Sequence, residues 1–379
     1  MTHVCLGDVA REIKQKVPVD QELPTVGLEH LDPGEVELAH WDEGVKTTFT
    51  KAFSKGQVLF GRRRAYLRKA AVAPFDGICS GDITVIAPKD NLSPRLLPFI
   101  IQNDALFEHA ITNSAGSLSP RVKWQSLSQF EFELPSIAKQ EDLADILWTA
   151  QETRSHYRQL LTACDDVVKS QFVEMFGGPD PTESDCPPVT IGELAADIRY
   201  GTSKKASDSG EFKYLRMNNM TDDGRLDLSD LKYIDLSGAE LENAKVVRGD
   251  LLFNRTNSRE KVGKTCVFNK NEPMVIAGYI VRVRFDERVE PGYVSAFLNS
   301  SYGKGLLRKM AKGAVGQANI SAKEMAKIEL PLPPIELQRS FLDFAASVDK
   351  SKFAVQKALD ELNATTKKIL NQELGLGDV

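Results

Sequence analysis

Positive charge is concentrated in three short segments of the chain. GRRRAYLRK, residues 61–69, contains five cationic residues and no acidic one. The other two cationic segments are FNRTNSREKVGK at residues 253–264 and YGKGLLRKMAKG at residues 302–313. The formal net charge of −5 argues against indiscriminate polyanion binding, but local basic loops can still hold a phosphate backbone. An ordinary solvated surface is the alternative interpretation of residues 61–69.

Motifs of catalysis are absent from the sequence. VGKT at residues 262–265 is similar to the end of a phosphate-binding loop, but Ser258 stands where that loop needs glycine, and the residues that follow are typical of a strand. No Gly-x-Ser-x-Gly, His-Glu-x-x-His or Gly-x-Gly-x-x-Gly occurs, and neither does the Asn/Asp-Pro-Pro-Tyr/Phe motif that amino-methyltransferases use to hold a flipped base. The sequence therefore predicts a binding protein without catalytic residues.

Cysteine and histidine are scattered. The five cysteines form no Cys-x-x-Cys pair, which indicates reduced thiols and a cytoplasmic location. The five histidines are equally dispersed, so we expect no metal site and no cofactor on this chain. No apolar run approaches the roughly 18 residues of a membrane span, and the start of the sequence lacks a signal-peptide pattern.

Three pairs of short segments recur in the same order. FELPSIAKQEDL (132–143) corresponds to PLPPIELQRSF (331–341), with Gln140 and Gln338 at equivalent positions. The other pairs are VCLGDVAREI with VTIGELAADI, and KGQVLF with RGDLLF. A repeat of about half the chain is too long for a solenoid. We therefore predict two domains related by duplication.

A long helical pattern follows each glutamine. Residues 141–176 and 338–374 contain neither proline nor glycine, and each could form a helix roughly 50 Å long. Apolar residues recur in both with a period of 3.5, which is typical of a coiled-coil seam. The expected seam residues are Leu143, Leu147, Tyr157, Leu161, Phe341, Val348, Val355, Leu359 and Leu362. Pro135 and Pro333 precede the helices, and their fixed φ angles would make a rigid connection between each domain and its helix.

One irregularity also recurs: a cation, Arg154 or Lys352, occupies the fourth seam position in each helix. This parallel favours mutual antiparallel pairing over two separate surface helices. In register, Tyr157 would meet Val355, Arg154 would face Leu359, and Lys352 would face Leu161. Both cations would then have to extend their charged heads into water.

The segments between the markers are predicted to be mixed α/β. Each half contains several strands, then a helical pattern (94–112 and 291–311), then a Gly/Ser-rich loop (114–120 and 311–321). The order is shared but the residues hardly match. This is expected of two domains that recognise different targets, although divergence by drift remains an alternative.

Taken together, these features resemble the DNA-specificity subunit of type I restriction–modification systems, over essentially the whole chain. The matching segments are the Gly-Asp/Glu opening of each half, the KGQVLF and RGDLLF strands, QANIS at residues 317–321, LPLPPIELQ and SQFVEMFG. The first half departs from the pattern, because LPSIAKQ has one proline and SLSPRVKW replaces the QANIS-like loop.

The resemblance implies an α+β fold with two duplicated target-recognition domains, separated by two long helices that form an antiparallel coiled coil in a pseudo-two-fold arrangement. We expect the first domain at 1–138, the first helix at 139–178, the second domain at 179–335, and the second helix with the tail at 336–379. The implied function is non-catalytic recognition of a bipartite, asymmetric site in double-stranded DNA. Two methyltransferase subunits carrying S-adenosylmethionine and restriction subunits using ATP and Mg would be partners, in DNA methylation and phage defence.

Cationic loops would set the register on phosphates, while Arg, Asn, Gln and Lys could contact base edges. For each residue, surface charge or a structural hydrogen bond is an equal alternative. The candidates in the first half are Lys46, Thr47, Arg62, Arg63, Arg64, Tyr66, Arg68, Ser117 and Arg121. Those in the second half are Lys204, Lys205, Arg216, Asn218, Asn219, Arg255, Asn257, Arg259, Lys264, Gln317 and Asn319.

Two other functions remain open at this point. The first is a stand-alone DNA-binding adaptor or regulator without methyltransferase partners. The second is a purely structural coiled-coil protein whose basic loops are incidental. A self-contained restriction enzyme is disfavoured because methylation and nuclease motifs are missing.

Overall fold

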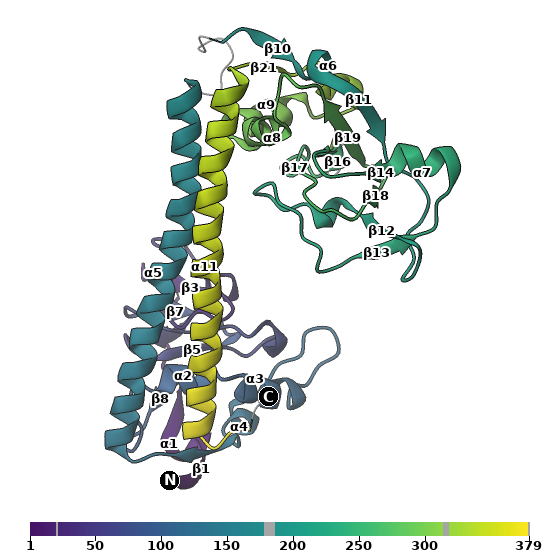
Figure 1. Ribbon diagram of the computed structural model, residues 1–379. Helices are drawn as coiled ribbons and strands as arrows, with labels where there is room; N and C mark the ends of the chain where they lie inside the picture. The colour runs from purple at the N-terminus through teal and green to yellow at the C-terminus, as the bar shows by residue number, and fades with distance from the viewer. Residues whose placement is uncertain (20–21, 178–185, 314–317, 378–379) are drawn as a thin grey trace. The chain divides into compact units, whose positions relative to one another are not determined.

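The computed structural model describes residues 1–19, 22–177, 186–313 and 318–377. The chain divides into two compact units: unit 1 is Met1–Leu160 with Val355–Val379, and unit 2 is Leu161–Ala354. Two long helices, α5 (Ile137–Phe176) and α11 (Ile335–Glu373), each begin in one unit and end in the other (Figure 1).

Unit 1 contains a four-stranded sheet in the order β2-β8-β5-β6, a three-stranded sheet in the order β3-β7-β4, and the antiparallel pair β1-β9. The strands are β1 (Thr2–Cys5), β2 (Ala10–Ile13), β3 (Thr25–Val26), β4 (Lys51–Phe53), β5 (Val58–Gly61), β6 (Ala70–Val72), β7 (Gly77–Cys79), β8 (Ile83–Pro88) and β9 (Glu131–Leu134). The short helices are α1 (Leu6–Val9), η1 (Leu28–His30), η2 (Ala65–Leu67), α2 (Leu97–Ile101), α3 (Asp104–Thr112) and α4 (Trp124–Leu127).

Unit 2 repeats this arrangement. Its sheet β11-β19-β15-β17 corresponds to β2-β8-β5-β6, and β12-β18-β14 corresponds to β3-β7-β4 with β13 added at one edge. The strands are β10 (Pro188–Thr190), β11 (Ala195–Tyr200), β12 (Phe212–Leu215), β13 (Lys232–Ile234), β14 (Lys245–Val246), β15 (Leu251–Asn254), β16 (Thr256–Asn257), β17 (Thr265–Val267), β18 (Met274–Ile276), β19 (Ile280–Phe285), β20 (Ala318–Asn319) and β21 (Glu329–Pro331). The helices are α6 (Ile191–Leu194), η3 (Met217–Asn219), α7 (Gly238–Ala244), α8 (Pro291–Asn299), α9 (Ser301–Met310) and α10 (Ala322–Met325).

One inner strand of each main sheet, β5 or β15, is buried on both faces. This burial explains the continuous apolar residues at the ends of KGQVLF and RGDLLF. In β5, Val58 and Phe60 join one core cluster, while Leu59 joins the other. Successive side chains of a strand point to opposite faces, so one strand serves two cores. In β15, Leu251 and Leu252 are divided between two clusters in the same way.

The Gly in each N-terminal marker permits a close backbone approach. Gly7 donates its N–H to Ser128 O at 2.8 Å, and Gly192 donates to Ala326 O at 2.8 Å. A Cβ added at Gly7 would lie 3.0 Å from Ser128 Cβ, and one at Gly192 would lie 3.0 Å from Ala326 O. Any side chain there would push the two segments apart, so the repeated glycine is structural.

Each helical pattern of the two halves forms two helices where the sequence predicts one. Residues 94–112 form α2 and α3, because Asn103 interrupts the run and caps α3 by accepting the N–H of Ala105 at 2.8 Å. Residues 291–311 form α8 and α9, since Ser300 caps α9 by accepting the N–H of Gly303 at 3.1 Å. Side-chain caps start new helices even where the apolar period continues.

The long helices pair antiparallel, as expected from their sequences. In unit 1, Leu143 and Leu147 near the start of α5 share a core cluster with Leu370 near the end of α11. In unit 2, Phe172 and Phe176 at the end of α5 pack with Phe341 near the start of α11. The helices α5 and α11 are followed by Gly177 (φ 76°) and Gly375 (φ 63°), in the left-handed conformation that commonly ends a helix.

The expectation that both seam cations extend into water is wrong for Lys352. Its ammonium binds the Asp165 carboxylate of α5, and its side chain is only 11% exposed. Arg154 is half-buried and donates to Gln151 Oε1 at 3.2 Å. Lys352 thus binds a carboxylate on the facing helix, while Arg154 binds an amide one turn away on its own helix and keeps its buried Nε without a partner among the described residues. A seam pattern of apolar residues does not reveal these contacts.

Candidate nucleic-acid interface

The basic segment of unit 1 holds two arginines in an unusual backbone conformation. Arg64 (φ 56°) and Arg68 (φ 51°) flank η2 in the left-handed region, where a side chain costs roughly 1–2 kcal/mol. Such conformations persist only where neighbouring contacts hold them, and they cluster at functional sites.

For Arg64, such contacts come from the Gly/Ser-rich loop between α3 and α4. Arg64 N–H donates to Pro120 O at 2.7 Å, and Val122 N–H donates to Arg62 O at 3.0 Å. The backbones of Arg63 and Arg121 pair in an isolated antiparallel β-bridge. The fold therefore brings together four predicted contact residues from segments about 60 positions apart in the sequence.

One carboxylate organises these cations. Asp82 Oδ1 accepts from Arg121 Nε at 2.7 Å, and Asp82 Oδ2 accepts from Arg63 Nη1 at 3.2 Å. Burial alone raises the pKa of Asp82, but the hydrogen bonds from Arg121 and Arg63 outweigh it and hold the pKa below its usual value. We call Asp82, Arg63 and Arg121 the Asp82 cluster; it keeps a net positive charge and fixed donor positions.

The other candidates of unit 1 lie in different settings. Arg68 binds Asp104 and Glu108 of α3, the latter at 2.6 Å, so it anchors η2. Arg64, which follows Arg63 in the chain, Tyr66 of η2 and Ser117 of the loop are all exposed. Within the described part of unit 1, no hydrogen bond or ion pair joins Lys46 or Thr47 to these residues.

Unit 2 repeats this backbone arrangement with different side chains. Ile320 N–H donates to Arg255 O at 2.9 Å, and Arg255 N–H donates to Tyr279 O at 2.9 Å. These bonds match those from Val122 to Arg62 O and from Arg62 to Asp82 O. Thr256 and Asn319 pair where Arg63 and Arg121 pair in unit 1.

Predicted contacts of unit 2 gather around this pairing of β16 with β20. The Arg255 guanidinium lies 5.0 Å above the Tyr200 ring, a cation–π contact that the sequence did not suggest. Thr256 Oγ1 donates to Asn319 Oδ1 at 2.9 Å, and Asn257 pairs with Ala318 in the strand register. Gln317, the remaining candidate of this loop, lies outside the described residues.

The remaining candidates of unit 2 mostly bind carboxylates or the backbone of their own chain. Asn219 is buried and satisfies the backbone of Arg216, Asp227 and Asp230. Arg216 and Asn218 both bind Asp230, at 2.7 and 3.1 Å. Lys204 binds Glu240 at 2.6 Å, and Lys264 binds Asp222 at 2.7 Å, whereas Lys205 and Arg259 are exposed.

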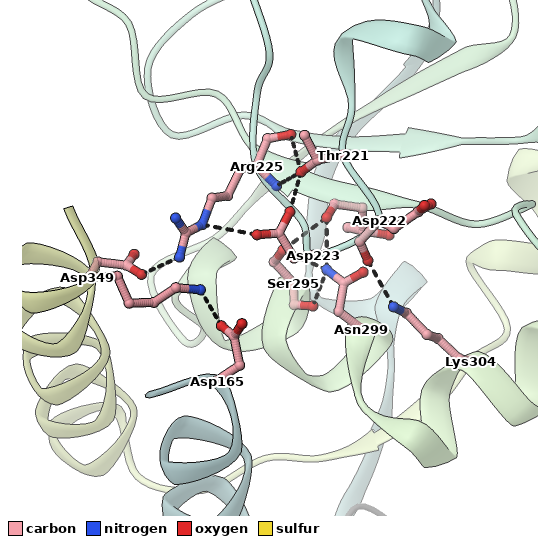
Figure 2. A network of polar contacts seen from close by, with 11 residues as sticks. Asp165, Thr221, Asp222, Asp223, Arg225, Ser295, Asn299, Lys304 and Asp349 are labelled. Carbon is pink, nitrogen blue, oxygen red and sulfur yellow. Dashed lines mark hydrogen bonds and ion pairs between the residues drawn. The ribbon is translucent and has the colours of Figure 1, made fainter. Parts of the chain in front are cut away.

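A turn at residues 221–225 contacts helices α9 and α11 through Lys304 and Asp349, as Figure 2 shows, and it also binds Lys264 in the loop before β17. Asp222, which binds Lys264, accepts at its backbone oxygen from Lys304 Nζ of α9 at 2.8 Å. Arg225 binds Asp223 of the same turn and Asp349 of α11. The acidic segment TDDGRLDLSD thus fixes the position of the basic loop that contains Lys264. The composition of the acidic segment alone did not indicate this role.

Among the residues with described positions, no group of three His, Cys, Asp or Glu side chains could hold a metal ion. Across the same residues, no helix combines the length and the apolarity that crossing a membrane requires.

The chain belongs to the family described as the type I restriction modification DNA specificity domain, whose model matches residues 2–159 and 184–372. It is 24% identical over 286 residues to the type I restriction enzyme EcoKI specificity subunit of Escherichia coli K12, and 25% identical over 186 residues to the putative MjaX specificity subunit of Methanocaldococcus jannaschii. These matches cover 70% and 48% of this chain. The chain spans 62% and 44% of those relatives' lengths.

Two solved structures share the fold. One is a chain from a study of complex assembly and conformational transition of the type I R-M system, with a TM-score of 0.62 and 19% identity, covering 100% of this chain and 98% of that one. The other is the type I restriction–modification S subunit from M. genitalium, with a TM-score of 0.56 and 12% identity, covering 100% and 96%. The α+β fold with two recognition domains and paired long helices agrees with the architecture expected from the sequence.

Proposed function

We propose that the chain is a non-catalytic DNA-recognition subunit that reads a bipartite, asymmetric site in double-stranded DNA. Residues 1–138 and 179–335 would be the two target-recognition domains, joined through helical segments at 139–178 and 336–379. Residue 178 and the start of the second domain lie outside the described residues. The observation that supports the proposal is that both units repeat the same backbone hydrogen bonds but place different side chains at the equivalent positions.

At those positions unit 1 has Arg63 and Arg121 around Asp82, while unit 2 has Thr256 and Asn319. Arginine donates in a bidentate fork that suits guanine or phosphate, whereas asparagine suits adenine. Phosphate contacts set the register and base-edge contacts set the sequence. Two copies of one backbone frame with different donors would therefore recognise two different half-sites.

The proposal includes partners that supply the chemistry. Two methyltransferase subunits would bring S-adenosylmethionine, and restriction subunits would bring ATP and Mg, in the cytoplasm. A docking surface for a partner helix is offered by α5 in unit 1, where Ile146 and Leu160 are about half exposed. Their separation of two heptads places both on one face of the helix.

The test is a genome-wide map of adenine methylation in cells with and without this gene, combined with co-purification. We expect a split motif that disappears on deletion and a methyltransferase subunit that purifies with the tagged chain. Specific DNA binding without any methyltransferase would support the stand-alone adaptor instead. An unchanged methylome in cells that carry the partner genes would contradict the proposal.

A further inference from the structure

Leu118 is the most exposed large apolar side chain in the described chain, with 91% of its surface accessible. It lies in SAGSLSP, the loop between α3 and α4, which extends away from these two helices in Figure 1. Gly116 in this loop has a φ of 118°, a conformation that L side chains rarely adopt. The loop is therefore shaped by its own sequence to project a leucine.

The base of this loop is held on both sides. Ala115 and Arg121 exchange backbone hydrogen bonds of 3.0 and 2.9 Å. Ser119 Oγ accepts from Arg63 Nη2 at 3.1 Å, and Pro120 O accepts from the Arg64 N–H. Because residues directly after Leu118 are fixed to the basic segment, the leucine is presented at a defined place beside the Asp82 cluster.

The surroundings of the tip are cationic. Arg63 and Arg121 belong to the Asp82 cluster, and Arg64 is exposed without a carboxylate partner in the described chain. An apolar tip flanked by arginines suits DNA better than an apolar protein groove, because the arginines can hold phosphates while the tip meets the base stack. Proteins that kink DNA insert leucine or similar side chains between base steps in this way.

We propose that Leu118 is a wedge that enters the base stack of the half-site bound by unit 1 and unstacks one base step. This inference rests on the proposed function and adds a contact that neither charge nor motif suggested. Residues 314–317 of the corresponding loop in unit 2 lie outside the described residues, so the inference concerns unit 1 alone. Unstacking one step would also bend the duplex locally, which gives sequence preference through deformability.

The experiment uses the full-length chain with the methyltransferase subunit that purifies with it. The methylation map supplies the half-site, and 2-aminopurine, an adenine analogue that pairs with thymine, replaces each adenine of its two strands in turn, except the methylated adenine. The wild-type complex should give increased fluorescence at one step. Leu118→Ala should abolish that increase and lower specific affinity about tenfold, while Leu118→Met should retain most of both.

Val19→Ala, which truncates another exposed apolar residue of unit 1, is the matched control and should leave fluorescence and affinity unchanged. Thermal unfolding should show the same midpoint for Leu118→Ala and wild type, because the side chain is exposed.

Four results would overturn the wedge. The first is a fluorescence increase that Leu118→Ala leaves intact. The second is the absence of any increase when the wild-type complex binds its half-site specifically. The third is a lower unfolding midpoint for Leu118→Ala, which would make Leu118 structural. The fourth is loss of the methyltransferase subunit from Leu118→Ala with normal fluorescence, which would make the tip a protein contact. Absence of any specific DNA binding by the wild-type complex would instead defeat the proposed function itself.

Discussion

Gln140 and Gln338 make the same three hydrogen bonds in the two units. Gln140 donates to Pro135 O at 2.9 Å and Asn91 O at 3.2 Å, and accepts from Ser93 N–H at 2.8 Å. Gln338 donates to Pro333 O at 2.8 Å and Arg288 O at 3.2 Å, and accepts from Glu290 N–H at 2.8 Å. Each buried amide thus joins the first turn of a long helix to the loop that follows a central strand.

Replacing either glutamine with alanine should destabilise the unit that contains it by about 1–3 kcal/mol, because backbone groups lose their partner while buried. Chemical unfolding of Gln140→Ala and Gln338→Ala measures this. Gln125→Ala is the control, since Gln125 is exposed in the same unit as Gln140. Equal stabilities for Gln140→Ala and Gln125→Ala would refute the structural role of the buried amide.

Removing the charge of Asp82 should loosen Arg63 and Arg121. We expect Asp82→Asn to lose roughly 1 kcal/mol of stability at neutral pH and to weaken binding to the half-site of unit 1. The pKa of Asp82 is lower in the folded state, so its contribution is full above the unfolded pKa of about 3.9 and is lost as pH falls through the folded value. Unfolding curves of both proteins should therefore converge as the pH falls; a difference in stability that does not shrink with falling pH would contradict this assignment.

Two arginines of one segment should behave differently on substitution. Arg64→Ala should lower the slope of log affinity against log salt by about one unit without changing stability, because the exposed guanidinium is free for a phosphate. Arg68→Ala should mainly lower stability, since it removes the contacts to Asp104 and Glu108. DNA titrations at several salt concentrations, paired with thermal unfolding, separate the two effects. If Arg64→Ala lowered stability and Arg68→Ala lowered the salt slope, Arg68 rather than Arg64 would be the residue that contacts phosphate.

Removing the two partners of the ion pair between Lys352 and Asp165 should lower the free energy of unfolding by different amounts. Asp165→Ala leaves a nearly buried ammonium without its partner and should cost about 2 kcal/mol or more, whereas Lys352→Met should cost less because an apolar seam residue replaces the pair. Unfolding of both variants and of the double variant gives the comparison. If Lys352→Met proves the more damaging change, the pair stabilises the seam in its own right.

The sequence revealed the duplication, the two long helices, their antiparallel pairing and the succession of strands, helical segment and Gly/Ser-rich loop along each half. These features extend over many residues, so the spacing of the repeated segments and the period of the apolar residues predict them. Local pairs were less visible: Asp82, Tyr200 and Asp222 came from segments that looked like ordinary turns or strands. Each contacts a residue at least 19 positions away, and only the fold brings them together.

The loop SLSPRVKW illustrates this limit. Its residues differ from QANIS, yet Arg121 and Val122 occupy the positions that Asn319 and Ile320 occupy in unit 2, with matching backbone bonds to Arg62 and Arg255. Backbone hydrogen bonds do not depend on side-chain identity, so the arrangement survives divergence that obscures the sequence match.

The most direct measurement of the central claim is the methylation motif produced by variants of each unit. Arg63→Ala with Arg121→Ala should relax or change one half of the split motif, and Arg255→Ala with Asn319→Ala should change the other half, with the gap between the halves preserved. Changes in both halves from one pair of substitutions, or in neither half from both pairs, would contradict the account of two independent half-site readers.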